Sequence, residues 1–116
     1  PGGRMAIVLP RGIFKNYTDE RVRRFLIQRA EIKAVVSLTG EMFKPFTNTK
    51  TCVVFVKKRD AILNDLADAE ADFPIVYAVS EKPGKDRSGK LVRDNEGKIV
   101  SDFDEIETFL KENIIW

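Results

Sequence analysis

Short apolar runs separated by polar turns dominate the chain and predict the strands of an α/β sheet. Met5 to Leu9 is wholly apolar and stops at Pro10, a pattern typical of a strand buried on both faces in the middle of a sheet. Two further runs, rich in β-branched residues, predict strands at Ile32 to Leu38 and Thr51 to Val56. Pro74 to Val79 predicts an edge strand, because a proline is tolerated at the start of one.

Helical periodicity appears between the first two strands and again after the third. Val22, Phe25 and Leu26 form one apolar stripe of a helix that Thr18 is expected to cap and that should end near Ala30. Strand, helix and strand in this order predict a right-handed parallel crossover. The third strand follows the second after a loop alone, so these two are expected to pair antiparallel. A second helix is predicted from Asp60 to Ala69.

From Pro83 the chain becomes hydrophilic and rich in glycine. Two similar segments, Lys90 to Val92 and Lys98 to Val100, bracket a turn of Asp94 to Gly97 and predict an exposed hairpin. Ser101 and Asp104 resemble a capping box for a last helix, whose apolar stripe is Ile106, Phe109 and Leu110. We therefore expect residues 1–80 to form the main part of one domain, and residues 81–116 its hairpin and helix extension.

Composition limits the chemistry that this chain can perform by itself. Without histidine there is no nucleophile–histidine relay, and with Cys52 as its one cysteine the chain cannot build a cysteine-rich metal site. We therefore expect no bound metal. A net charge of +2 is too small to indicate nucleic-acid binding. The lone thiol in an apolar run, with neither a membrane span nor a signal peptide, favours a cytoplasmic protein. A start at Pro1 rather than Met indicates an excised piece.

The loop from Thr39 to Lys50 is the most informative segment for function. Phe43 and Phe46 lie outside any regular periodicity, among lysines and small polar residues. A loop aromatic can stack on a base swung out of a duplex while lysines hold the phosphates. The alternative interpretation is that both rings anchor the loop to the core.

The order of these motifs resembles the modification subunits of type I restriction enzymes, which are adenine-N6-specific DNA methyltransferases. In that family the strand after the catalytic motif is similar to Gly2 to Pro10, which Gly12 follows. A helix like Val22 to Leu26 comes next, and then the strand, loop and strand matched by Ile32 to Val56. Gly84 to Lys90 resembles a later glycine-and-lysine segment. The resemblance implies the C-terminal portion of a Rossmann-like, S-adenosylmethionine-dependent methyltransferase domain, with an antiparallel strand pair in a mixed sheet.

The resemblance also implies roles for individual residues. Phe43 falls where related enzymes stack a phenylalanine on the flipped adenine, and Lys50 and Thr51 fall where they place groups near the DNA or the base. Pro10 and Gly12 follow the first strand, so they are expected to border the cleft at the carboxyl ends of the strands. An ordinary strand-ending turn is the alternative for this pair.

Two family motifs are missing from this chain. The family places its S-adenosylmethionine motif and its Asn/Asp-Pro-Pro-aromatic motif upstream of the matched region, and the five prolines here are never adjacent. We therefore expect S-adenosylmethionine to bind the parent protein and not this piece, which should be inactive alone. The expected partners are double-stranded DNA and the specificity and restriction subunits, with no membrane. An exposed sheet edge at Met5 to Leu9 would invite self-association.

Two other functions remain open at this level. A non-enzymatic module could bind DNA or a partner subunit, or the same fold could belong to a fused restriction–modification or phage-defence methyltransferase. The hairpin region could contact phosphates or a subunit, although interspersed acidic residues favour a solvated hairpin instead. Its basic residues are Lys82, Lys85, Arg87, Lys90, Arg93 and Lys98.

Overall fold

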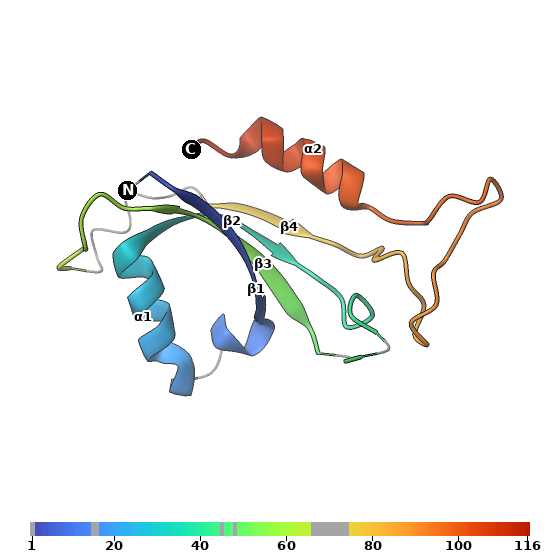
Figure 1. Cartoon of the computed structure of the whole chain (residues 1–116), viewed down its shortest axis with the longest axis horizontal. Coiled ribbons are helices and arrows are strands. Elements are labelled where there is room, and N and C mark those ends of the chain that lie inside the picture. The colour runs from blue at the N-terminus through green and yellow to red at the C-terminus, as the bar shows by residue number, and fades with distance from the viewer. Residues whose placement is uncertain (1, 15–16, 45, 48, 66–74) are drawn as a thin grey trace.

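The fold is a four-stranded sheet with one helix on each face (Figure 1). The computed structural model describes residues 2–14, 17–44, 46–47, 49–65 and 75–116. Short 3-10 turns at Arg11–Phe14 and Tyr17–Asp19 connect the first strand to the first helix. The main elements, in chain order, are β1 (Arg4–Pro10), α1 (Glu20–Arg29), β2 (Ala30–Ser37), β3 (Thr51–Lys58), β4 (Val76–Val79) and α2 (Phe103–Asn113).

The strands lie in the order β1-β3-β2-β4. Strand β3 runs antiparallel to both β1 and β2, and β4 runs parallel to β2, so β1, β2 and β4 share one direction. This arrangement confirms the predicted mixed sheet, the antiparallel pairing of the second and third strands, and the edge position of the fourth. The strands on either side of α1 are parallel as predicted, but β3 lies between them.

In this chain Met5 to Leu9 is not buried on both faces, and it forms the exposed sheet edge that was also expected there. Strand β1 lies at an edge of the sheet, where only Ile7 and Leu9 are half-buried and its other residues are exposed. β3 occupies the place beside β2 and leaves β1 outside it. An apolar run predicts a strand, but it does not show whether one or both faces of that strand are covered.

Two hydrophobic clusters join the helices to the sheet. On the α1 face, Leu26 packs against a cluster that includes Cys52 and Val54. On the α2 face, Leu110 is buried with Val36 and Leu38 of the second strand and its end. Alternate residues of a strand point to opposite faces, and the two central strands, β2 and β3, contribute to both clusters. Neither described helix is long and apolar enough to cross a membrane.

Residues 83–101 form a three-segment meander, which we call the meander throughout. The predicted turn is present, since the Asp94 amide donates to the Lys98 carbonyl at 2.8 Å. A second turn precedes it, in which the Asp86 amide donates to the Lys90 carbonyl at 2.9 Å. Gly84 has a φ of +81°, and a Cβ there would meet Ile99 at 2.7 Å, so both its backbone and its packing require glycine.

The predicted helix ends and one predicted helix need correction. Helix α1 begins at Glu20 after Asp19, so Thr18 does not cap it. Asp102 precedes α2, and the Ser101 hydroxyl accepts a hydrogen bond from the Phe103 amide, so no capping box with Asp104 forms. Residues 60–65 of the helix predicted from Asp60 contain no helical turn, and the rest of that range lies outside the described residues. A short apolar spacing is a weak helix signal, because isolated helices are marginal without tertiary packing.

Candidate functional site

The carboxyl ends of β1, β2 and β4 meet at one edge of the sheet, together with the start of β3. We call this the carboxyl edge, and open α/β sheets place their binding sites there. Backbone hydrogen bonds join the segments that leave it. The Arg11 amide donates to Lys50 at 3.0 Å, the Leu38 amide to Thr51 at 2.9 Å, and the Ser80 amide to Ser37 at 2.8 Å. Residues distant in sequence are thus held in one small region.

Three of the predicted site residues gather on the α2 side of this edge. Pro10 pairs with Thr51 in the strand register. Thr51 alternates with Val53 and Phe55, which face α2, so its side chain points to the same face. Phe43 packs against the buried cluster on that face. All three are thus on the same face of the sheet.

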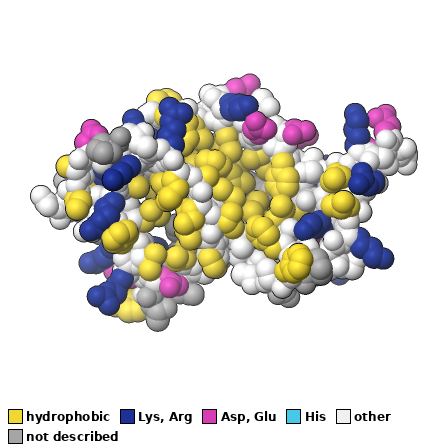
Figure 2. Space-filling view, in the orientation of Figure 1, with side chains coloured by type: hydrophobic (Ala, Val, Ile, Leu, Met, Phe, Trp, Pro, Cys, Tyr) yellow, Lys and Arg dark blue, Asp and Glu magenta, His cyan; other side chains and the backbone are white. Residues whose placement is uncertain are grey.

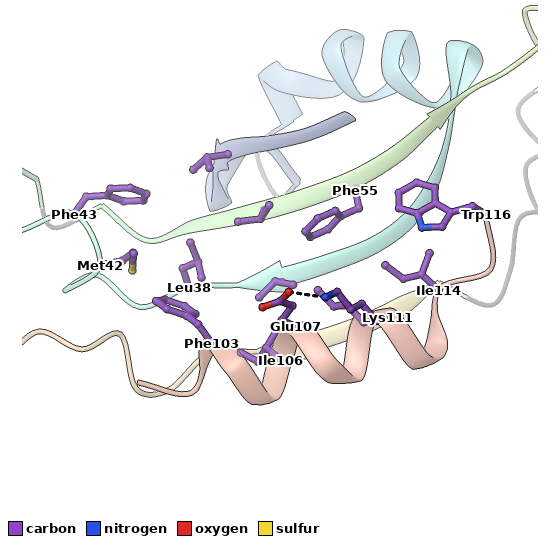
Figure 3. A pocket seen from close by; sticks show the side chains of 14 residues that line it. Leu38, Met42, Phe43, Phe55, Phe103, Ile106, Glu107, Lys111, Ile114 and Trp116 are labelled. Carbon is purple, nitrogen blue, oxygen red and sulfur yellow. Dashed lines mark ion pairs between the residues drawn. The ribbon is translucent and has the colours of Figure 1, made fainter. Parts of the chain in front are cut away.

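Phe43 lies at one end of an open apolar groove between the sheet and α2, with Trp116 at the other end (Figure 3). The groove has a volume of about 470 Å³, and Figure 2 shows hydrophobic side chains gathered over this region. The Phe43 ring is half-buried, so it is neither sealed in the interior nor free in solvent. Phe46 in the same loop is 93% exposed and anchors nothing.

Two threonine hydroxyls at the carboxyl edge are buried without a hydrogen-bond partner among the described residues. They are the Oγ1 atoms of Thr39, just after β2, and Thr51, the first residue of β3, which is 8% exposed. A buried polar group without a partner costs folding free energy, so native proteins rarely keep one without a reason. Sequence reasoning found Thr51 through the family resemblance and missed Thr39, since a threonine beside a turn carries no special signal.

The other predicted residues lie around this cluster in more ordinary settings. Lys50 and Pro10 are exposed, and Gly12 is half-buried in the 3-10 turn that follows β1. The side chain of Arg11, which sequence reasoning passed over, donates a short hydrogen bond to the Ser37 hydroxyl and links the ends of β1 and β2. Burial raises the pKa of the Cys52 thiol, against the opposing effect of the Arg11 charge, so this cysteine is a structural residue.

The basic residues of the meander lie together at one end of the molecule (Figure 2). Two of their acidic neighbours are held in place by hydrogen bonds within their own turns. The Asp86 carboxylate accepts hydrogen bonds from Ser88 and Lys90, and Asp94 accepts them from the Glu96 and Lys98 amides. Both aspartates are therefore engaged in forming their own turns.

The fold and this edge define an α/β protein with a mixed sheet, an aromatic loop and a carboxyl edge that carries threonine hydroxyls. A family model for N-6 DNA methylase matches residues 1–112. The chain belongs to the N-6 DNA methylase family.

Two solved structures resemble the chain over nearly its whole length. One chain, from a study of complex assembly and conformational transition of the type I R-M system, is 21% identical with a TM-score of 0.60 over 95% of this chain. The other is the modification subunit of a proposed type I restriction enzyme from Vibrio vulnificus YJ016, which is 20% identical with a TM-score of 0.58 over 99%. At this identity the likeness shows the fold. This chain spans 20% and 21% of those chains, respectively. No curated protein matches significantly.

The family implies S-adenosylmethionine, and the described residues do not fit it. The charged and hydroxyl groups of that cofactor require polar partners, whereas the groove is apolar except for Glu107 and Lys111, which pair with each other at 2.8 Å. A smaller cavity of about 80 Å³ beneath α1 is apolar apart from Arg23. Within the described residues no cluster of acidic, cysteine or histidine side chains could hold a metal.

Proposed function

We propose that this chain is part of an S-adenosylmethionine-dependent DNA adenine-N6 methyltransferase, the modification subunit of a type I restriction system. The observation that carries the proposal is the match to the N-6 DNA methylase family over residues 1–112. Similarity of fold to proteins of type I restriction systems supports the choice of system. The chain spans about a fifth of those proteins, so the isolated piece is proposed to be inactive.

Within that enzyme, the carboxyl edge supplies one wall of the pocket for the target base. Enzymes that modify a base inside a duplex first extrude it and then hold it by stacking and hydrogen bonds. Phe43, anchored on its inner side by the buried cluster, offers the stacking surface. The buried hydroxyls of Thr39 and Thr51 have no hydrogen-bond partner among the described residues, so each could donate or accept a hydrogen bond at the base once a movement of the pocket exposes it.

The remaining residues would act on the backbone of the DNA and on the pocket rim. The exposed Lys50 is placed to neutralise a phosphate, while Pro10 and Gly12 border the cleft. The cofactor and the groups that hold the exocyclic amine are proposed to come from other parts of the parent protein. Its partners would then be double-stranded DNA and the specificity and restriction subunits, in the cytoplasm. Residues 1–80 and 81–116 would act as one domain.

A non-enzymatic role in binding DNA or a subunit is the second candidate. It is favoured by the basic end of the meander, where the aspartates are occupied by their own turns. The open edge of β1 could also pair with a second copy. Both features are compatible with the methyltransferase, but by themselves they would provide no methyl transfer.

The test compares two phenylalanines of the same loop in the full-length protein. We expect Phe43→Ala to reduce methyl transfer to adenine in DNA by about 100-fold per folded molecule, since it removes the stacking surface. Phe46→Ala is the matched control, because that ring is 93% exposed and should change the rate little. The measurement is single-turnover methylation of adenine-containing DNA, and a separate DNA with 2-aminopurine in place of the target adenine reports base extrusion.

The outcomes separate the proposed roles. If Phe43→Ala only lowers the melting temperature and leaves turnover per folded molecule intact, the ring is a core anchor and the stacking role is wrong. If the unmodified full-length protein transfers no methyl group to adenine from S-adenosylmethionine, the enzymatic proposal falls and the binding module is left.

A further inference from the structure

Two reciprocal lysine hydrogen bonds tie the loop that carries Phe43 to the meander. The Lys85 ammonium donates to the main-chain carbonyl of Lys44 at 2.9 Å. The Lys44 ammonium donates in return to the carbonyl of Arg87 at 2.5 Å. We call this pair the lysine clasp. Because Lys44 follows Phe43 directly, the clasp acts on the backbone next to the ring.

Among the described residues, most of the loop's other hydrogen bonds are local. The amides of Phe46 and Thr47 donate to the Phe43 carbonyl at 3.0 and 3.2 Å, while the Phe43 ring packs against the buried cluster. Backbone held mainly by local turns keeps conformational freedom, which it must lose when a ligand is bound. Contacts with a distant segment remove that freedom in advance.

The meander is well suited to be the fixed partner. The turn that presents the Arg87 carbonyl is set by the Asp86 carboxylate, which accepts hydrogen bonds from the Ser88 amide, the Ser88 hydroxyl and the Lys90 amide at 2.6 to 3.0 Å. Hydrogen bonds to an ionised acceptor are shorter and stronger than neutral ones. The acceptor of the Lys44 bond is therefore held rigidly.

The base of the meander is fixed to the sheet in the same manner. The Asp102 carboxylate accepts hydrogen bonds from the Ser80 hydroxyl at 2.7 Å and from the Glu81 and Lys82 amides at 2.7 and 3.1 Å. Ser80 directly follows β4 and is 1% exposed. A continuous set of hydrogen bonds thus runs from the end of β4, through the meander, to the loop of Phe43. Figure 1 shows these segments at the same end of the molecule.

We infer that Lys44 and Lys85 are positioning residues for Phe43, through which the meander holds the ring ready at the base pocket. This inference rests on the proposed function, because it assumes that Phe43 receives the base. The basic character of the meander alone does not indicate this role. In the lysine clasp, both ammonium groups donate hydrogen bonds to main-chain carbonyls and do not serve as phosphate contacts. Preorganisation of this kind affects the chemical step more than the encounter with DNA.

The test uses the full-length protein and three lysine variants. Lys85→Met keeps the length of the side chain and removes its donor. We expect amide exchange at Phe46 and Thr47 to become about tenfold faster, and kcat to fall about tenfold, with 2-aminopurine emission changed and the Kd for DNA within about twofold of the parent. Lys85→Arg keeps a donor and should restore most of both losses. Lys90→Met is the control, since the Lys90 ammonium makes no hydrogen bond within the described residues.

Each outcome bears on the inference separately from the proposed function. If Lys85→Met matches Lys90→Met in exchange rate and kcat, the clasp does not position the loop and the inference is overturned. It is also overturned if Lys85→Met weakens DNA binding and leaves kcat unchanged, because the lysine would then be a phosphate contact. An intact rate in Phe43→Ala would remove the base-stacking role, while faster exchange in Lys85→Met would still show that the clasp holds the loop.

Discussion

Strands β1 and β2 are both short apolar runs, yet the structure gives them opposite environments. β2 lies between β3 and β4 and is covered by α2, so Val36 is 4% exposed. β1 lies at the edge of the sheet, with β3 as its neighbour. Val8 of β1 points to the same face of the sheet as Val36, but it lines the groove and is 49% exposed. The burial of an apolar residue is thus decided by its neighbours in space and not by its own segment.

The largest expected effect comes from the same substitution at these two valines. Val36→Asp places an unpaired carboxylate in the core and should lower the free energy of unfolding by at least about 4 kcal/mol. Val8→Asp leaves its carboxylate in contact with water and should cost about 1 kcal/mol or less. Urea unfolding of the chain measures both. An equally large loss for Val8→Asp, dependent on protein concentration, would mean that the groove is covered in solution by self-association.

The contrast also explains which parts of the fold the sequence predicts. The strands and the antiparallel pairing of the second and third follow from local patterns: apolar runs and a connection without a helix. β1 lies at the edge because β3 is inserted between β1 and β2. No local sequence pattern predicts this strand order. The helix expected from Asp60 had an apolar spacing, but residues 60–65 do not adopt it.

The candidate site divides along the same line. Phe43 and Thr51 came from a family resemblance, and Pro10 from its place at the end of the first strand; the strand register brings Thr51 and Pro10 together. Thr39 could not be predicted, because its significance is a buried hydroxyl without a described partner. The lysine clasp was equally hidden, since its bonds join residues about forty positions apart to main-chain carbonyls.

A smaller effect on stability is expected when two buried hydroxyls at the carboxyl edge, those of Ser80 and Thr51, are removed. Ser80 donates to Asp102 at 2.7 Å, so Ser80→Ala should destabilise the chain by about 1 to 2 kcal/mol. Thr51 has no described partner, so Thr51→Val should leave stability unchanged or raise it by about 1 kcal/mol. Thermal unfolding measures both. In the full-length protein, Thr51→Val should nevertheless reduce methyl transfer.

This combination of results identifies a residue retained for binding. If Thr51→Val destabilises the chain as much as Ser80→Ala does, its hydroxyl has a hydrogen-bond partner within the fold, and its availability for a base is disproved. If stability holds and methyl transfer is also unchanged, the hydroxyl has no role in the pocket.

The smallest expected effect is on the stability of the fold at low pH. It distinguishes Asp102, which joins distant segments, from Asp86, which bonds only within its own turn. Burial alone would raise the pKa of Asp102, but hydrogen bonds from Ser80, Glu81 and Lys82 outweigh it and hold the pKa below the usual 3.8. A carboxyl with a lowered folded-state pKa stabilises the fold above its unfolded pKa, and this stability is lost as pH falls through the folded value. Asp102→Asn should therefore flatten the loss of stability from about pH 5 to pH 2.

Asp86 provides the comparison. Hydrogen bonds from the Ser88 hydroxyl and the Lys90 amide also lower its pKa, but all its partners lie within four residues of it. Protonation of Asp86 should loosen one turn of the meander without altering global unfolding, whereas Asp102 joins the end of β4 to the start of α2. Urea unfolding of Asp86→Asn and Asp102→Asn across this pH range distinguishes them. Equal changes in the two variants would contradict this expectation and would show that the meander unfolds together with the sheet.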